Sequence, residues 1–217
     1  MPSLAIVGAS RGIGLEFVRQ YATDGWTVFA SARREQDLPM LRDLGATAYL
    51  ADTTDEASLA AMAEAIETLD VLIVNAGIGS REARLEDVDV ATWQRVMTVN
   101  ALGPLLAART LGQKVREGGK IVALSSVLGS IAENNGGAWS YRMSKAALNM
   151  GLSCLATEMK GREIKVVALH PGWVKTEMGG EQAPVEKVDS VAGMRRVIDT
   201  LATTGGYVDY QGKNIPW

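Results

Sequence analysis

Short apolar runs recur at fairly even intervals along this 217-residue chain, and segments with helical spacing separate them. The runs are Leu4–Gly8, Thr27–Ala30, Thr47–Leu50, Val71–Val74, Lys120–Leu124 and Lys165–Leu169. Continuous apolarity, rather than strict alternation, is what a strand buried on both faces of a parallel sheet requires. Between the runs, sets such as Ile13, Phe17 and Tyr21 place apolar groups on one helix face. The alternation predicts an α/β fold with a doubly wound parallel sheet and helices on both faces.

Length and composition indicate one ordinary globular unit. A chain of this length fits one large α/β domain, so we expect a single domain over residues 1–217. The net charge of −3 provides no overall positive field for nucleic acid or an anionic membrane. The chain has neither the roughly 20 uninterrupted apolar residues of a membrane span nor the pattern of a secretory signal. We therefore expect a cytoplasmic protein with neither nucleic acid nor membrane as a partner.

Cys154 is the only cysteine of the chain, so an internal disulfide is excluded. It lies in an apolar helical pattern, which predicts a buried thiol, and it fits a reducing compartment. No metal site is predicted.

A glycine-rich segment, Gly8-Ala-Ser-Arg-Gly12-Ile-Gly14, follows the first run directly and opens the first predicted helix. Small residues there let the backbone approach a pyrophosphate, and free amides with the helix dipole favour its charge. The spacing is G-x-x-x-G-x-G rather than the G-x-G-x-x-G of the general dinucleotide motif. In this context it predicts a Rossmann-type dinucleotide site that includes Gly8, Ser10, Arg11, Gly12, Ile13 and Gly14.

The charge after the second run indicates which dinucleotide binds. An NAD-dependent enzyme usually places a carboxylate there, beside the ribose hydroxyls. This chain instead has Arg33 and Arg34, and Arg11 lies in the glycine loop. Two guanidinium groups can clamp a 2′-phosphate through forked, charge-assisted hydrogen bonds, which predicts NADP(H) as the cofactor. The alternative is that Arg33 and Arg34 form a solvated surface pair.

Tyr141 and Lys145 begin a long helical pattern that continues through Leu148 and Leu152. Their i,i+4 spacing places both on one helix face. A free phenol titrates near pH 10, and a nearby ammonium and an oxidised nicotinamide would both favour the phenolate. Alone, this pair is a weak signal, because a core ring beside a solvated charge has the same spacing.

Further motifs accompany the pair: Asn75-Ala76-Gly77 after the fourth run, Asn100, Ser125-Ser126 after the fifth run, and His170-Pro171-Gly172 after the sixth. With the glycine loop, they make the chain resemble the short-chain dehydrogenase/reductase family over nearly its whole length. The resemblance is closer to the C-factor and sniffer-like carbonyl reductases, through Ser-Ser-Val-Leu-Gly-Ser-Ile, Tyr-Arg-Met-Ser-Lys-Ala-Ala-Leu-Asn and His-Pro-Gly-Trp-Val-Lys-Thr-Glu-Met-Gly-Gly.

The resemblance implies NADPH-dependent reduction of a ketone, aldehyde or quinone, reversible as alcohol oxidation. Tyr141 would protonate the carbonyl oxygen as hydride arrives at carbon. Lys145 would lower the pKa of the tyrosine and hold the nicotinamide ribose. Ser126 would hydrogen-bond the substrate oxygen, and Asn100 would anchor a water that passes protons through Lys145.

The resemblance also assigns the remaining cofactor contacts. Asp52 would contact the adenine, and Asn75, Ala76 and Gly77 would line its ribose, although a purely structural clamp is an equal alternative for Asn75. The residues implied for the nicotinamide carboxamide are Pro171, Gly172, Val174 and Thr176. Trp139 and Trp173, each near one of these segments, are candidate substrate contacts.

The interval from Ser126 to Tyr141 is longer than is usual in the family, so Ser125 and Ser130 remain alternatives for the serine that binds the substrate oxygen. The segment Glu133–Gly137 is expected to absorb the extra length.

The stretch from Gly179 to about Asp189 is predicted to be a mobile loop beside an open pocket. An alternative function is that of an NADP-binding signalling protein that acts through a partner. The family resemblance also implies that the protein forms a homodimer or homotetramer.

Overall fold

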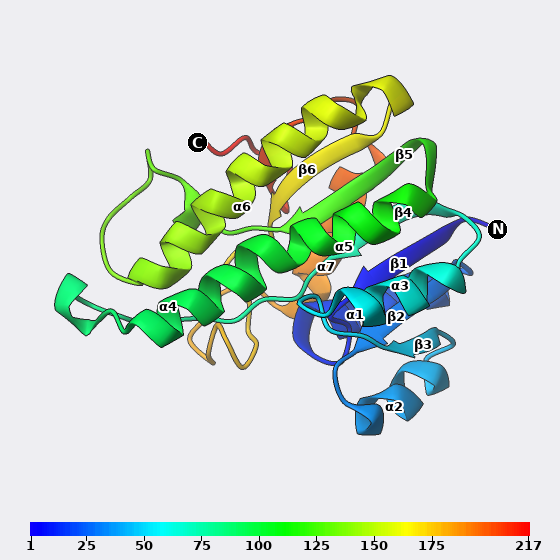
Figure 1. Cartoon of the computed structure of the whole chain (residues 1–217), viewed down its shortest axis with the longest axis horizontal. Helices are drawn as coiled ribbons and strands as arrows, with labels where there is room; N and C mark the ends of the chain where they lie inside the picture. Colours follow the sequence, from blue (N-terminus) through cyan, green and yellow to red (C-terminus); the bar gives the residue numbers. More distant parts are fainter.

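The computed structural model describes residues 1–217 and contains a single sheet in which all strands are parallel. The strands are β1 (Ser3–Val7), β2 (Thr27–Ala32), β3 (Thr47–Leu50), β4 (Leu69–Val74), β5 (Val115–Leu124), β6 (Lys165–His170) and β7 (Gly206–Asp209). Their order across the sheet is β3-β2-β1-β4-β5-β6-β7 (Figure 1). The chain therefore winds outward in both directions from β1 and β4, which confirms the predicted doubly wound sheet.

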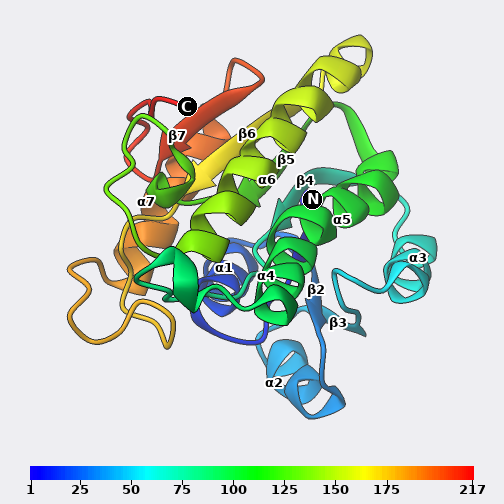
Figure 2. The same cartoon turned by 60° about the vertical axis from the view of Figure 1, so that its left-hand side comes forward.

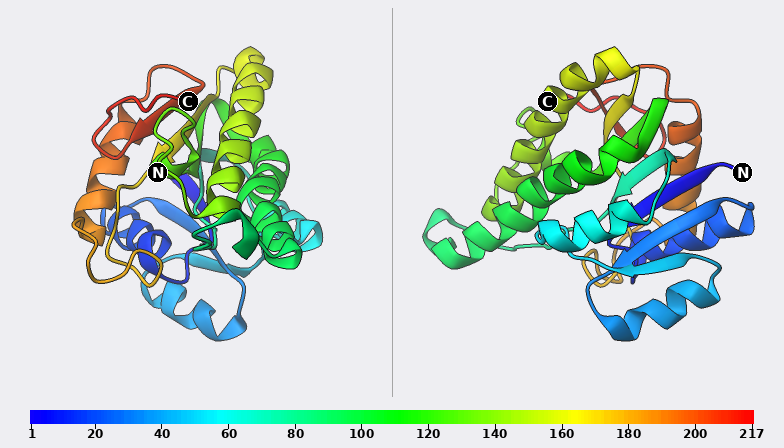
Figure 3. Two further views of the ribbon diagram at one scale, coloured as in Figure 1. Left: turned by 90° about the vertical axis from the view of Figure 1, so that its left-hand side faces the viewer. Right: turned by 45° about the vertical axis from the view of Figure 1, so that its right-hand side comes forward.

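Helices cover both faces of this sheet. They are α1 (Gly12–Thr23), α2 (Leu38–Asp43), α3 (Glu56–Glu64), α4 (Val90–Met97), α5 (Gly103–Leu111), α6 (Trp139–Glu158) and α7 (Lys187–Asp199). One core cluster packs α3, α5 and α6 against the sheet, and a second packs α1, α2 and α7 against the opposite face. The two helical layers are seen on either side of the strands in Figure 2 and in the left view of Figure 3.

The edge strands differ from the expectation of burial on both faces. In β3 both end residues are exposed, and Leu50 keeps 46% of its surface accessible, because β3 pairs only with β2. The expected full burial is wrong for this strand. At the other edge, β7 was not predicted, since Gly206–Asp209 contains no apolar run.

Cys154 is exposed, so the prediction of a buried thiol is wrong. The buried stripe of α6 includes Ser144, Leu148, Leu152 and Ala156, spaced four residues apart. Cys154 lies two residues after Leu152 and therefore projects from the opposite side of the helix.

The segment after β6 is shorter than the sequence indicates. Val174 and Val185 form an isolated bridge, and α7 already begins at Lys187, so the predicted loop ends before Asp189. None of the helices is both long enough and apolar enough to cross a membrane, and the folded chain contains no cluster of metal-ligating side chains.

Candidate active site

A groove of about 200 Å³ lies at the carboxyl ends of the central strands, where the strand order reverses. Most of the predicted cofactor residues line it: Gly8, Ser10, Arg11, Gly12, Ile13, Arg33, Asp52, Asn75, Ala76, Gly77, Tyr141, Lys145, Pro171 and Thr176. Four of the predicted residues do not: Gly14, Arg34, Gly172 and Val174. The fold thus brings together residues from six separate segments of the chain.

The glycine loop is held in shape by Asn75 and Ser31. Gly8 adopts a φ of +86°, and its N–H donates to Ser31 Oγ at 3.1 Å. The Gly8 carbonyl accepts a hydrogen bond of 2.6 Å from Asn75 Nδ2. A Cβ on Gly14 would overlap that carbonyl and lie 2.6 Å from Asn75 Nδ2. Asn75 therefore clamps the backbone as well as lining the groove, and Ser31 is a supporting residue that the sequence analysis missed.

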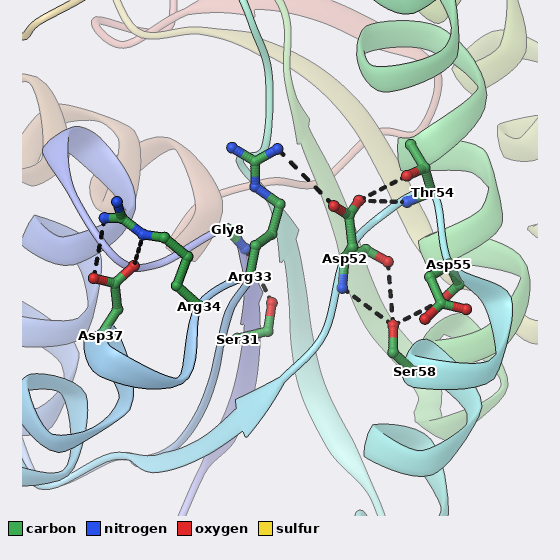
Figure 4. A network of polar contacts seen from close by, with 9 residues as sticks. All are labelled: Gly8, Ser31, Arg33, Arg34, Asp37, Asp52, Thr54, Asp55 and Ser58. Atoms are coloured by element: carbon green, nitrogen blue, oxygen red, sulfur yellow. Dashed lines mark hydrogen bonds and ion pairs between the residues drawn. The ribbon is translucent and has the colours of Figure 1, made fainter.

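The two consecutive arginines after β2 point in different directions (Figure 4). Arg34 forms two hydrogen bonds with the Asp37 carboxylate, of 3.0 and 3.1 Å, and does not line the groove (Figure 4). Arg33 lines the groove and lies 3.9 Å from Asp52, whose other oxygen accepts from the backbone and side chain of Thr54. Only the first arginine of the predicted pair is brought to the cofactor groove.

Arg11 projects from the glycine loop and forms an ion pair with Glu177, on the segment that follows β6. Both side chains line the groove. Their pairing joins two segments that flank the groove, and Arg11 and Arg33 are the two guanidinium groups that line it.

Tyr141 and Lys145 lie on the first turns of α6, as their spacing predicts. The Lys145 ammonium is buried, donates a hydrogen bond of 2.7 Å to the Leu124 carbonyl, and lies 5.7 Å from the centre of the Tyr141 ring. Burial lowers the pKa of Lys145 to about 8. Burial also raises the pKa of Tyr141, and a hydrogen bond with the Ser126 side chain opposes that rise. In the protein alone the phenol is therefore held in its protonated form.

The start of α6 is fixed by the segment after β4. Ser80 Oγ accepts the Tyr141 N–H at 2.9 Å, and the Ala138 N–H donates to the Glu82 carbonyl at 2.7 Å. The Ser140 hydroxyl donates to the Glu82 carboxylate at 2.5 Å. These contacts give the helix that carries Tyr141 a defined beginning, and no sequence motif indicates them.

Asn100 is fully buried in a π-helical turn, Thr98–Leu102, between α4 and α5. Its Oδ1 accepts from the Ile78 N–H, and its Nδ2 donates to the Ile78 carbonyl, both at 2.8 Å. Nδ2 also lies 3.0 Å from Ser144 Oγ on α6. Asn100 therefore joins the segment after β4 to α6, the helix that carries Tyr141 and Lys145. Turns of the π type are frequent at functional sites.

The three candidate serines have different surroundings. Ser125 Oγ donates to Asn149 Oδ1 and Ser130 Oγ donates to the Pro216 carbonyl, both at 2.6 Å. Ser126 Oγ accepts only a 3.2 Å bond from the Leu128 N–H and is the serine that interacts with the Tyr141 phenol. The hydroxyl protons of Ser125 and Ser130 are thus donated to structural acceptors, whereas the Ser126 hydroxyl faces the Tyr141 phenol.

A second cavity, of about 540 Å³, adjoins the groove and shares Tyr141 with it. Trp173 lines this cavity, donating from Nε1 to the Gly179 carbonyl at 2.8 Å, but Trp139 does not. Gly172 and Val174 line it rather than the groove. His170 also contributes, with a pKa that burial lowers to about 4, so its ring is neutral near pH 7.

Comparisons with known proteins agree with this arrangement. The family model of short chain dehydrogenases matches residues 3–187. The C-signal of Myxococcus xanthus is 46% identical over 154 residues, which cover 69% of this chain and 93% of that protein. The carbonyl reductase Sniffer of D. melanogaster superposes with a TM-score of 0.91 and 28% identity over 100% of both chains. The NADPH-bound carbonyl reductase from chicken fatty liver gives a TM-score of 0.90 and 32% identity, over 100% of this chain and 99% of that one. The chain therefore belongs to the short-chain dehydrogenase/reductase family, as its motifs indicate.

Proposed function

We propose that this protein is an NADP(H)-dependent carbonyl reductase in which Tyr141 is the general acid. The observation that carries the proposal is the position of Tyr141, which lines both the cofactor groove and the adjoining cavity, beside Lys145 and Ser126. A group there can reach a molecule in either space. A carbonyl bound in the cavity would lie next to a proton donor and next to the cofactor.

The residues of the groove fit a dinucleotide with a 2′-phosphate. No side chain caps the start of α1, so its first backbone N–H groups remain available to a pyrophosphate. A side chain on Gly77 would occupy the space beside Lys145, because its Cβ would lie 3.7 Å from the lysine Nζ. Arg33 and Arg11 supply positive charge at the groove for a 2′-phosphate. The NADPH-bound carbonyl reductase of similar fold supports this assignment.

The protein's own residues account for the proton transfer. When bound, NADPH supplies the hydride that reduces the carbonyl carbon. Ser126 donates a hydrogen bond to the substrate oxygen, and Tyr141, protonated because burial raises its pKa, gives its proton to that oxygen. Lys145 provides the positive charge that stabilises the resulting phenolate, and Asn100 fixes the segment beside it.

The test is consumption of NADPH, with NADH in parallel, against quinones, diketones and aromatic aldehydes. Tyr141→Phe should lower kcat by about a thousandfold while NADPH still binds, since general acid catalysis contributes about 10²–10⁴. Tyr49→Phe, on the edge strand β3 and outside both cavities, is the matched control and should behave like the native chain. Equal turnover by native protein and Tyr141→Phe would contradict the assignment.

The similarity to the C-signal favours a second candidate, an NADP-binding protein that acts through a partner with little turnover. The same assay separates the two functions. Tight NADPH binding without turnover of any compound, in native and variant protein alike, would support the signalling function.

We further infer from the family that residues 1–217 form one catalytic domain, and that the protein works in the cytoplasm as a homodimer or homotetramer on a small-molecule carbonyl substrate. Light scattering after gel filtration measures the assembly. A mass near 23.1 kDa would identify a monomer and contradict this inference.

A further inference from the structure

The cavity beside Tyr141 contains one fully charged side chain, Arg81. The rest of its wall is apolar or neutral, with an apolar surface formed by Ile13, Val127, Leu128, Trp173, Val174 and Met178. His170 adds no charge, because burial lowers its pKa to about 4. No aspartate or glutamate lines this cavity. The space is therefore a mainly apolar chamber with a single positive group.

Arg81 has no acidic partner within ion-pairing distance. The neighbouring Glu82 accepts a hydrogen bond from the Ser140 hydroxyl through one carboxylate oxygen, and Glu177, next to Met178 in the chain, pairs with Arg11. The one hydrogen bond of the Arg81 guanidinium is a 3.3 Å contact from Nη2 to the Met178 carbonyl. Because a guanidinium carries five N–H donors, most of its capacity remains free.

The hydrogen bond to the Met178 carbonyl also fixes the position of the Arg81 side chain. It joins the segment after β4 to the segment after β6, and these two segments pack closely, since a Cβ on Gly79 would lie 3.6 Å from the Met178 side chain. The neighbouring Ser80 holds the Tyr141 N–H. Arg81 is thus placed at the rim of the cavity, adjacent to the start of the helix that carries the proposed acid.

We propose that the preferred substrates are carbonyl compounds with an apolar or aromatic body and a carboxylate, which Arg81 binds at the rim of the cavity. The inference rests on the proposed function and deepens it. A substrate that fills the cavity removes water from one side of the guanidinium, and a carboxylate can replace that water with forked, charge-assisted hydrogen bonds. A neutral group cannot do so, and a cationic group is repelled.

The test compares two aromatic aldehydes of the same shape, 4-carboxybenzaldehyde and its methyl ester. The native protein should show a kcat/KM about tenfold higher for the carboxylate, the factor expected for charge-assisted hydrogen bonds at a partly exposed site. The ester withdraws electrons more strongly and is the more reactive aldehyde, so intrinsic reactivity works against this result. After correction for the intrinsic reactivity of each aldehyde, kcat/KM should be lowest for a trimethylammonium-substituted benzaldehyde.

Variants show whether Arg81 causes the preference. In Arg81→Gln the ratio of the two kcat/KM values should fall about tenfold, and Arg81→Lys should retain part of it. Arg84→Gln is the matched control, because Arg84 pairs with Glu86 and does not line the cavity, and its ratio should equal the native one. Raising the ionic strength should reduce the native ratio towards that of Arg81→Gln.

The outcomes separate this inference from the proposed function. Turnover of both aldehydes with the same ratio in native protein and Arg81→Gln would overturn the carboxylate site and leave the reductase assignment standing. If no aldehyde, quinone or diketone is turned over, the reductase assignment fails, and calorimetric binding of terephthalate then decides the inference. Binding that weakens in Arg81→Gln, but not in Arg84→Gln, would support the site, and equal binding by all three proteins would overturn it.

Discussion

At the scale of single residues, two adjacent arginines provide a test of cofactor choice. Arg33 lines the groove, whereas the guanidinium of Arg34 is held by Asp37. If Arg33 binds the 2′-phosphate, Arg33→Gln should lower kcat/KM for NADPH by about ten- to a hundredfold, the range for a charge-assisted hydrogen bond, and leave NADH unchanged. Arg34→Gln should change the NADPH value by less than about threefold, as expected for loss of an exposed ion pair. An equal loss of kcat/KM for NADPH in both variants would contradict the assignment of the 2′-phosphate to Arg33 alone.

A second residue-scale prediction concerns Gly14. Any side chain there would overlap the Gly8 carbonyl and the Asn75 amide, and both belong to the clamped loop. Gly14→Ala should therefore lower the free energy of unfolding by about 1–3 kcal/mol, as overpacking does, and should weaken NADPH binding. Gly161→Ala is the control, because a Cβ on Gly161 would meet no atom within 4 Å. Urea denaturation and NADPH titration measure the two effects, and unchanged stability in Gly14→Ala would contradict the close packing described for the loop.

At the scale of elements, β7 supports the loop that carries Ser126. The Tyr207 hydroxyl donates to the Ser126 carbonyl, and the Tyr207 ring packs against Trp217 with 5.1 Å between ring centres. Tyr207→Phe would leave a buried carbonyl without its partner, which costs about 1–3 kcal/mol of stability. Because the loop would then be less well positioned, kcat should fall several-fold with little change in KM. Tyr49→Phe serves again as the control, and an unaltered kcat in Tyr207→Phe would argue against a supporting role for β7.

The same elements show where prediction from sequence succeeds and where it stops. Runs such as Val71–Val74 and Lys165–Leu169 were placed correctly because an all-parallel interior demands continuous apolarity. β7 was missed, because its place depends on pairing with β6, between Val167 and Gly206, rather than on its own composition. The π turn at Thr98–Leu102 was also missed, since no propensity marks a single widened turn inside a helix.

At the scale of the whole molecule, the site is assembled from the segments that follow β1, β2, β3, β4, β5 and β6, together with the start of α6. The sequence predicted which loops would meet, because parallel strands present their carboxyl ends at one edge. It could not predict which side chains would turn inward: Arg33 reaches the groove and Arg34 does not, and Trp173 reaches the cavity and Trp139 does not. Those orientations depend on individual polar partners, such as the Asp37 carboxylate that holds Arg34 from three residues away, and the apolar pattern does not indicate them.

His170, the only histidine of the chain, should make the free energy of unfolding depend on pH between about 6.5 and 4. Burial lowers its pKa to about 4 in the folded state, and its Nδ1 is buried without a hydrogen-bond partner. An unfolded chain should protonate this histidine near pH 6.5. As the pH falls from 6.5 to 4, the unfolded state therefore takes up the proton first, and the free energy of unfolding decreases.

The folded protein should lose up to about 3 kcal/mol from this group across that range, which corresponds to the separation between the two pKa values. His170→Asn has no titrating ring, so it should lack this part of the acid dependence while retaining the part due to carboxylates. Urea denaturation of both proteins at half-unit steps between pH 7.5 and 4 measures the difference. The native curve should fall more steeply than the variant curve below pH 6.5 and run parallel to it above. Parallel curves over the whole range would mean that His170 is protonated as readily in the folded protein as in the unfolded chain.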